Sequence, residues 1–334
     1  MRPEALQDNY TLSSMQLQSC FSYAILGGKS KNRERGFMDA QEKKLLMIVN
    51  PRAGKSKSRG PLYDAAAIFS GNGYLVKIHN TVAPGDARDC ARREGGHYDA
   101  VVAVGGDGTL NEVVTGLMKL DAPPPLGYLP QGSTNDFAAS LHLSQDPAEA
   151  AMTVAQSAGR RLDIGQWNRR YFVYVASFGA FTRSSYSAPQ NVKNALGHFA
   201  YLLEGVKDLD SLRPYPIRLT ADGETLDGEY LFGAVCNTLS IGGIVKLTPE
   251  QVALDDGLFE LLLVPNPRTP ADLQDFMISF MNQDYAGKGL IFRHAASIHV
   301  ETSDALPWSL DGEYAPGVPS VDISNRRQAL SMLL

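Results

Sequence analysis

The sequence predicts an α/β domain with a doubly wound, mainly parallel sheet, followed by a β-rich antiparallel sandwich domain. The first observation is that strand and helix patterns alternate from residue 45 to about residue 160, which is typical of strands joined by crossover helices. The second is that short strand patterns follow one another after Arg161 with few helices between them. The chain of 334 residues is long enough to bury two cores.

The first half contains short, β-branched apolar runs, which predict buried strands, between segments with helical spacing of apolar residues. The predicted strands are Leu45–Val49, Tyr74–His79, Ala100–Val104 and Leu126–Leu129. The predicted helices are Leu62–Gly71, Asp86–Glu94, Leu110–Met118, Asp136–Leu141 and Pro147–Ala158.

The second half is rich in strand patterns, and Asp222-Gly223 and Asp227-Gly228 mark turns between them. The predicted strands are Arg161–Gly165, Tyr171–Ser177, Ile217–Thr220, Tyr230–Thr238, Leu258–Val264, Ser297–Glu301 and Val321–Ser324. Two helical patterns lie near residues 190–209 and 270–282. The first is amphipathic, which predicts a helix packed on the core and leaves a lipid-facing surface as the alternative.

Composition excludes several classes of protein. A hydrophobic content of 44% and a charged content of 20% are typical of a globular protein, and the net charge of −5 argues against a nucleic-acid partner. Cys20, Cys90 and Cys236 are far apart in the sequence, which indicates a reducing cytoplasm and no zinc site. No run approaches the roughly 20 apolar residues of a transmembrane helix, so any membrane contact is expected to be peripheral. Residues 1–43 are polar and are expected to be a partly disordered extension.

The most informative motif joins a predicted strand to a predicted helix. Val101–Val104 is apolar, Gly105-Gly-Asp-Gly108 forms a turn, and apolar residues then recur from Leu110 with helical spacing. Glycines let backbone N–H groups approach a phosphate closely, and a helix N-terminus favours an anion. A purely structural turn explains the motif equally well when it is considered alone.

Two further loops follow predicted strands in the same way. The loop 50–60 combines Asn50, Pro51 and Gly54 with four basic residues, and the loop 132–137 contains glycine, hydroxyl, amide and carboxylate groups. Carboxyl ends of parallel strands line one crevice of a doubly wound sheet, so the three loops are expected to meet there. Backbone N–H groups and carboxylates in one place are what a nucleotide with Mg²⁺ requires.

In their order along the chain, these motifs resemble the diacylglycerol kinase catalytic domain family, especially its bacterial soluble lipid kinases. The resemblance covers residue 45 to the end, and Gly-Gly-Asp-Gly alone is shared with NAD kinases and phosphofructokinases. The matching segments are Asn50-Pro-x-x-Gly54, Gly105-Gly-Asp-Gly-Thr-x-Asn-Glu112, Gly132-Ser-x-Asn-Asp-Phe137, Leu254-Asp-Asp-Gly257 and Asp311-Gly-Glu313.

The resemblance implies an ATP site and three catalytic carboxylates. Asp107 and Asp136 are expected to hold the catalytic Mg²⁺ directly or through water, and Glu313 to act as the general base. Without the other motifs, Asp311-Gly-Glu313 would be interpreted as a hairpin turn. The residues expected to contact ATP are Asn50, Pro51, Gly54, Lys55, Thr81, Gly105, Gly106, Asp107, Gly108, Thr109, Asn111, Gly132 and Ser133.

The resemblance also implies a second, structural Mg²⁺ in the turn before the strand predicted at Leu258–Val264. Its ligands would be Asp256 and the backbone carbonyls of Ala253 and Leu258, and a purely structural turn is the alternative. Lys193 aligns with a family lysine near the active site or a dimer surface. The expected domains are 44–162 plus 317–334, which bind ATP, and 163–316, which bind the lipid acceptor.

We therefore expect an ATP-dependent cytoplasmic kinase that phosphorylates the hydroxyl of diacylglycerol to give phosphatidic acid. Expected partners are ATP, a membrane lipid met by peripheral contact and, as an option that the resemblance leaves open, a second copy of the chain. The alternatives are another acceptor (a sphingoid base, ceramide, undecaprenol or NAD) or a nucleotide-binding regulator without catalysis. The intact Asp107, Asp136 and Glu313 argue against the regulator.

Overall fold

The computed structural model describes residues 42–53, 60–132, 135–179, 214–241, 245–248, 250–285, 287–303 and 306–334. Contacts between Cα atoms place residues 42–334 in one compact unit. The predicted extension before residue 42, the helix predicted near 190–209 with Lys193, and the ATP-site residues Gly54, Lys55 and Ser133 lie outside the described residues.

The first part of the fold is a parallel sheet, as predicted, and its strands lie in the order β2-β1-β3-β4. The observed strands are β1 (Lys43–Val49), β2 (Tyr74–Asn80), β3 (Ala100–Gly105) and β4 (Leu126–Pro130). The helices that connect or follow them are α1 (Gly60–Gly71), α2 (Asp86–Glu94), η1 (Gly95–His97), α3 (Asp107–Leu117), α4 (Asp136–Ser140) and α5 (Pro147–Gln156).

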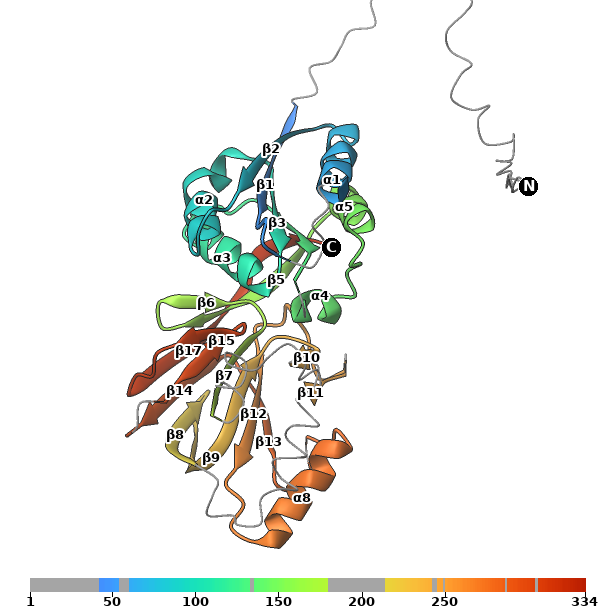
Figure 1. Cartoon of the computed structure of the whole chain (residues 1–334). Coiled ribbons are helices and arrows are strands. Elements are labelled where there is room, and N and C mark those ends of the chain that lie inside the picture. Colours follow the sequence, from blue (N-terminus) through green and yellow to red (C-terminus); the bar gives the residue numbers. More distant parts are fainter. Residues whose placement is uncertain are drawn as a thin grey trace, which may run out of the picture. The chain divides into compact units, whose positions relative to one another are not determined.

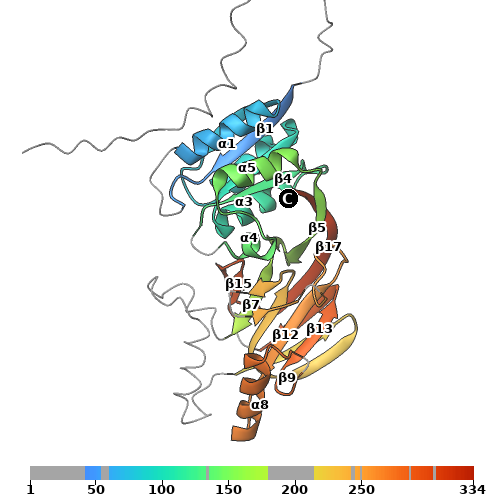
Figure 2. The same ribbon diagram turned by 90° about the vertical axis from the view of Figure 1, so that its right-hand side faces the viewer.

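Helices cover both faces of this sheet because its strands are apolar on both faces. Leu46 and Ile48 of β1 pack in the core that includes α2 and α3, whereas Leu45 and Met47 pack in the core that includes α1 and α5. Figure 1 shows the two pairs of helices on opposite sides of β1–β3, and in Figure 2 α1 and α5 lie side by side over the sheet.

Local signals explain where several helices begin. The Asp146 carboxylate accepts the N–H groups of Ala148 and Glu149 at the start of α5. Thr269 and Asp272 form a reciprocal capping box at the start of α8 (Pro270–Met281). Both helices begin with proline. Proline is favourable there because the N–H at the first position of a helix has no hydrogen-bond partner within the helix, so its absence costs nothing.

The second part of the fold is rich in antiparallel strands, as predicted. Its core contains Phe178, Leu219, Phe259, Ile298 and Trp308 from five different strands. The strands are β5 (Arg160–Trp167), β6 (Arg170–Phe172), β7 (Val175–Gly179), β8 (Tyr215–Ala221), β9 (Glu224–Cys236), β10 (Ser240–Ile241), β11 (Val245–Lys246), β12 (Phe259–Pro265), β13 (Ile291–Ala295), β14 (Ser297–Thr302), β15 (Trp308–Leu310), β16 (Glu313–Ala315) and β17 (Ser320–Leu333).

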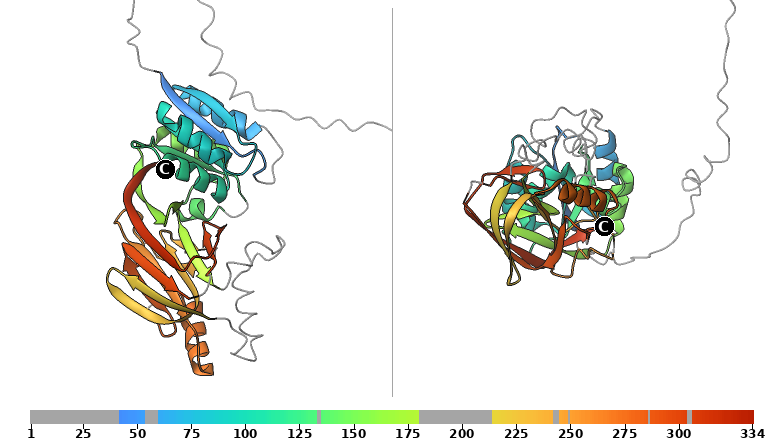
Figure 3. Two further views of the ribbon diagram at one scale, coloured as in Figure 1. Left: turned by 90° about the vertical axis from the view of Figure 1, so that its left-hand side faces the viewer. Right: turned by 90° about the horizontal axis from the view of Figure 1, so that it is seen from below.

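Strand β17 joins the antiparallel strands to the parallel sheet. It pairs antiparallel with β14 and β5, and its last residues Met332 and Leu333 pair parallel with Leu126 and Gly127 of β4. Figure 3 shows β17 as a long curved strand at the red end of the colour scale. The sequence predicted only Val321–Ser324, because a polar run with a register shift before Leu330 interrupts the strand pattern.

The strand predicted at Tyr171–Ser177 is two strands, β6 and β7, so this prediction was wrong. The N–H groups of Val173 and Tyr174, between the two strands, donate to the carboxylate of Asp311 instead of to a neighbouring strand. Helix α3 begins three residues earlier than predicted, at Asp107 itself. Within the described ranges, no helix is both long enough and apolar enough to cross a bilayer.

Truncation of Met332 is expected to destabilise the whole fold. Its side chain is 1% exposed in the core formed with α2 and α3, so Met332→Ala removes buried apolar contacts and leaves a cavity. The free energy of unfolding in urea should fall by about 2–5 kcal/mol. Arg326→Ala, at an exposed position on the same strand, should change it by less than about 0.5 kcal/mol. Equal effects of both substitutions would contradict the packing of β17.

Candidate active site

The carboxyl ends of the parallel strands lie together, as the sequence predicted for a doubly wound sheet. The N–H of Asn50, after β1, donates to the carbonyl of Val104 at 2.9 Å, and the N–H of Thr81, after β2, donates to that of Val49 at 2.8 Å. The Asn50 side chain donates to Oγ1 of Thr109 at 3.1 Å. Residues from three separate loops therefore form one edge.

Two glycine loops touch at this edge. The N–H of Gln131, after β4, donates to the carbonyl of Gly105 at 2.7 Å. A Cβ placed on Gly132 would lie 2.6 Å from Cα of Gly106, a distance that no side chain tolerates. Asn135, which the sequence analysis did not assign to the site, fixes the second loop because its Oδ1 accepts the N–H of Gly132 at 2.7 Å.

The two predicted magnesium carboxylates are neighbours. Asp107 is the first residue of α3 and is buried, and its Oδ2 accepts the N–H of Asp136, the first residue of α4, at 3.1 Å. Burial, followed by the negative charge of Asp107, raises the pKa of Asp136 to about 6. Two carboxylates held close in a partly desolvated place fit a divalent cation, because the cation would relieve their repulsion.

Glu313, the predicted general base, lies against the glycine turn although 205 residues separate it from Gly108. Its Oε1 would be 3.1 Å from a Cβ placed on Gly108, so a side chain at this position would crowd the carboxylate and shift it by a few tenths of an ångström. The backbone of Glu313 belongs to β16, which pairs with β15, and the residue is exposed. An exposed carboxylate beside a glycine turn and a helix N-terminus can accept a proton from a substrate bound there.

Asp311 holds the turn that carries Glu313, and the sequence analysis missed this role. Its carboxylate is 3% exposed and accepts the N–H groups of Val173, Tyr174 and Val175 at 2.6–3.0 Å. It also accepts Nδ2 of Asn111 at 2.7 Å. Burial raises the pKa of Asp311 to about 6, and these N–H groups oppose the rise. The Asp-Gly pair predicts the turn, in which Asp311 and Gly312 both have positive φ, but the local sequence carries no signal that this carboxylate is buried.

The turn predicted to bind the second cation is held by two hydrogen bonds from its backbone to carboxylates. Oδ1 of Asp256 accepts the N–H of Leu258 at 2.8 Å, and Gly257 has φ of +91°. The buried carboxylate of Asp163, which was not predicted, accepts the N–H of Gly257 at 2.6 Å. Ala253 is exposed on the same turn. The three predicted ligands lie within six consecutive residues, Ala253 to Leu258, around this turn.

Glu260 provides a reason to expect a cation near this turn. It is 1% exposed, and both of its carboxylate oxygens lack a hydrogen-bond partner among the described residues. Burial, with the negative charges of Asp256 and Asp163, raises its pKa to about 8. Without a cation this shift favours the protonated carboxyl at neutral pH, whereas a cation held close to it would favour the ionised form, so the residues present fit the group.

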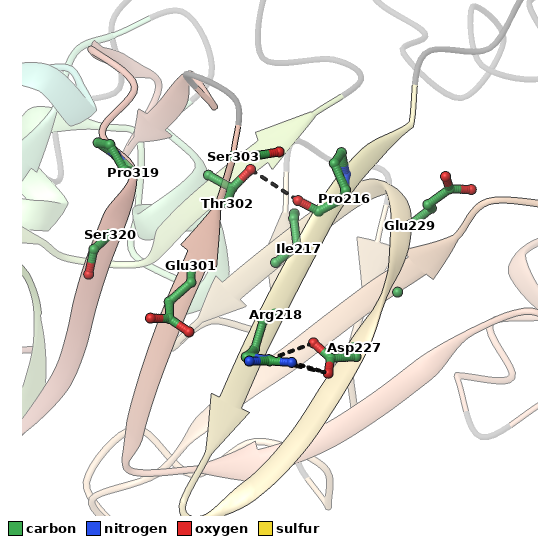
Figure 4. A pocket seen from close by; sticks show the side chains of 11 residues that line it. Pro216, Ile217, Arg218, Asp227, Glu229, Glu301, Thr302, Ser303, Pro319 and Ser320 are labelled. Carbon is green, nitrogen blue, oxygen red and sulfur yellow. Dashed lines mark hydrogen bonds and ion pairs between the residues drawn. The ribbon is translucent and has the colours of Figure 1, made fainter.

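Other parts of the described chain offer weaker candidates. Within the described ranges there is no group of three or more His, Cys, Asp or Glu side chains that could hold a metal ion. Both predicted cation sites would therefore need backbone or water oxygens as further ligands. A surface pocket of about 680 Å³ lies on β8, β9, β14 and β17 (Figure 4). Arg218 in this pocket is paired with Asp227, and none of the predicted site residues lines it.

Comparisons with known proteins agree with the motifs. Residues 44–167 match the model of the diacylglycerol kinase catalytic domain. The chain is 36% identical over 282 residues to a diacylglycerol kinase of Bacillus subtilis (strain 168), covering 83% of this chain and 92% of that protein. The chain belongs to the diacylglycerol kinase catalytic domain family. It is therefore a kinase, an ATP-dependent phosphotransferase, as its motifs predicted.

Further comparisons cover the part of the chain after residue 174. Residues 175–334 match the YegS C-terminal NAD kinase beta sandwich-like domain. A diacylglycerol kinase of Staphylococcus aureus (strain bovine RF122 / ET3-1) is 33% identical over 280 residues, which cover 83% of this chain and 88% of that protein. A crystal structure of a diacylglycerol kinase from Bacillus anthracis str. Sterne has the same fold, with a TM-score of 0.67 at 24% identity over 87% of this chain and 96% of that chain.

The buried carboxyl of Glu260 should make the stability of this kinase depend on pH. Its pKa rises from an ordinary 4.5 to about 8 on folding, so in EDTA the folded state loses stability as pH increases between these values. Glu260→Gln removes the ionisable group, and its Tm relative to wild type should increase progressively from pH 5 to pH 8. Glu224→Gln, at an exposed position on β9, should show a constant difference. A constant difference for Glu260→Gln would contradict this account.

Proposed function

We propose that this kinase transfers the γ-phosphoryl group of ATP to the hydroxyl of diacylglycerol and so forms phosphatidic acid. The observation that carries the proposal is the contact between Glu313 and Gly108, because it puts a carboxylate base beside an anion-binding turn. The names of the Bacillus subtilis and Staphylococcus aureus relatives support diacylglycerol as the acceptor.

The glycine turn and α3 would hold the phosphates of ATP. Glycines 105, 106 and 108 leave the backbone N–H groups open to close approach, and the N-terminus of α3 favours negative charge. Asn50, Thr81 and Gly132 come from the neighbouring loops and would line the same nucleotide. Positioning and charge stabilisation account for most of the catalysis of phosphoryl transfer, so a rigid edge suits this reaction.

Glu313 would align the acceptor hydroxyl and take its proton. The hydroxyl oxygen forms a bond to the γ-phosphorus while the bond between that phosphorus and the bridging oxygen of ADP breaks, and the proton passes to the Glu313 carboxylate. Asp107 and Asp136 would hold Mg²⁺ for this site. When bound, Mg²⁺ would neutralise charge that develops on the phosphate oxygens.

The proposal includes a division of labour along the chain. Residues 44–162 with 317–334 would bind ATP, and residues 163–316 would supply Glu313 and the lipid site. A cytoplasmic enzyme of this kind meets its acceptor at a membrane surface, so we infer peripheral membrane contact. The other expected partner is a second copy of the chain, and the mass of the purified protein in solution would show whether it forms a dimer.

The test compares wild type with Glu313→Gln on a panel of acceptors. With Mg-ATP, wild type should transfer labelled phosphate to diacylglycerol in mixed vesicles, and Glu313→Gln should lose about 10²–10⁴-fold in kcat while retaining ATP affinity. Tyr314→Phe, which alters the exposed neighbour of Glu313, serves as the control. Transfer only to ceramide, sphingosine, undecaprenol or NAD would contradict the acceptor, and a fully active Glu313→Gln would contradict the base.

A second prediction concerns the structural cation. If Asp256 and the carbonyls of Ala253 and Leu258 bind Mg²⁺, then Mg²⁺ stabilises the folded state and raises the Tm of the protein without nucleotide. Asp256→Ala should reduce this rise to the part that binding at Asp107 and Asp136 contributes. Asp255→Ala, next to it, should retain the rise because Asp255 is paired with Arg160. An equal rise in Asp256→Ala would exclude Asp256 as a ligand.

A further inference from the structure

We propose that Asn111 is a positioning residue that acts through Asp311 on Glu313, and not a contact of ATP. The inference rests on the proposed function, in which Glu313 is the general base. The family resemblance groups Asn111 with the ATP-binding residues, whereas the hydrogen bonds of its side chain indicate a different task.

The amide nitrogen of Asn111 is already fully used. Nδ2 donates to Oδ2 of Asp311 at 2.7 Å and to the carbonyl oxygen of Tyr171 at 3.1 Å. A side-chain amide has two N–H protons, so neither remains for a phosphate oxygen. Its Oδ1 is an acceptor, which a phosphate oxygen would repel. The carbonyl oxygen of Tyr171 and the ionised carboxylate of Asp311 can accept hydrogen bonds but cannot donate them. The atom of the Asn111 amide that faces them must therefore be the nitrogen, which assigns the orientation of the amide.

Asp311 is fixed on its other side by the backbone between β6 and β7. Three N–H groups in succession donate to its carboxylate, and its own N–H donates to the carbonyl of Val175 at 2.9 Å. Asp311 has a positive φ of 49°, which its buried contacts maintain. The bond from Asn111 is the contact of this carboxylate with α3.

The bond between Asn111 and Asp311 affects the position of Glu313 because both of its residues are close in sequence to the residues of the site. Asn111 is three residues after Gly108 in α3, and Glu313 is two residues after Asp311. The two segments therefore meet twice, through the bond between Asn111 and Asp311 and through the contact of Glu313 with Gly108. Loss of the first contact would remove the hydrogen bond that ties the Asp311 turn to α3, so the packing of α3 against β6 and a long, exposed side chain would define the distance from the base to the phosphate-binding turn.

The experiment measures kcat, KM and ATP affinity of Asn111→Ala with Mg-ATP and diacylglycerol vesicles. Because misplacement of a catalytic group by about 1 Å can reduce a rate about 10²-fold, kcat should fall by about that factor while the Kd for ATP stays at its wild-type value. Asn72→Ala is the matched control, since it truncates an exposed asparagine just after α1 whose side chain donates only to the carbonyl of Ile68 among the bonds described. It should retain full kcat.

Combining substitutions separates positioning from a general loss of structure. In a Glu313→Gln background, Asn111→Ala should cause no further loss in the single-turnover rate, because the base on which Asn111 acts has been removed. An additive loss would overturn the inference. If Asn111→Ala lacks a cooperative thermal transition, Asn111→Ser, which keeps a hydroxyl donor, takes its place with the same expected pattern.

The outcomes distinguish this inference from the proposed function. An inactive Glu313→Gln with normal kcat in Asn111→Ala would overturn the positioning role alone. A weakened ATP affinity with unchanged kcat in Asn111→Ala would identify Asn111 as a nucleotide contact and also overturn it. A fully active Glu313→Gln would remove the base itself, and both proposals would fall together.

Discussion

The carboxylate of Asp311 is the contact on which the arrangement of the candidate site depends. It is buried, and the three successive backbone N–H groups of residues 173–175 and the Asn111 side chain all donate to it. A buried carboxylate is stable only with such a set of donors, because an unpaired charge in the interior is costly. In satisfying this one group, the fold interrupts a strand, shapes the turn before Glu313 and ties that turn to α3.

The same contact explains how distant segments of the sequence form one site. The glycine turn follows β3, whereas Glu313 lies near the end of the chain. A glycine is needed at position 132, where a Cβ would lie 2.6 Å from Cα of Gly106, and a Cβ on Gly106 or Gly108 would crowd the facing loop or the Glu313 carboxylate at 3.1 Å. The glycines of this site therefore allow close contact between loops, and in the proposed function they would also open the backbone to an anion.

The sequence predicted the elements with strong periodicity and the motifs, but not the contacts between them. Helix α2 was predicted with its exact bounds, and the parallel strands within one or two residues, because buried strands and amphipathic helices leave clear local patterns. The break between β6 and β7 could not be predicted, since its cause is Asp311, which is more than 130 residues away. The full length of β17 was not predicted, because its polar middle segment lacks a strand pattern in the sequence, although in the structure the strand pairs with β5 on both sides of a register shift. The roles of Asp163 and Glu260 were missed because nothing in the local sequence shows that a carboxylate is buried.

In the proposed mechanism the phosphate-binding turn and the base face the same point. The decisive measurement is a structure of the protein with Mg²⁺ and a non-hydrolysable ATP analogue. The γ-phosphate should lie at the N-terminus of α3, on the side of Gly108 where the Glu313 carboxylate is found, with the Asn111 side chain still bonded to Asp311. A triphosphate bound away from this turn, or Asn111 turned toward the phosphates, would contradict this mechanism.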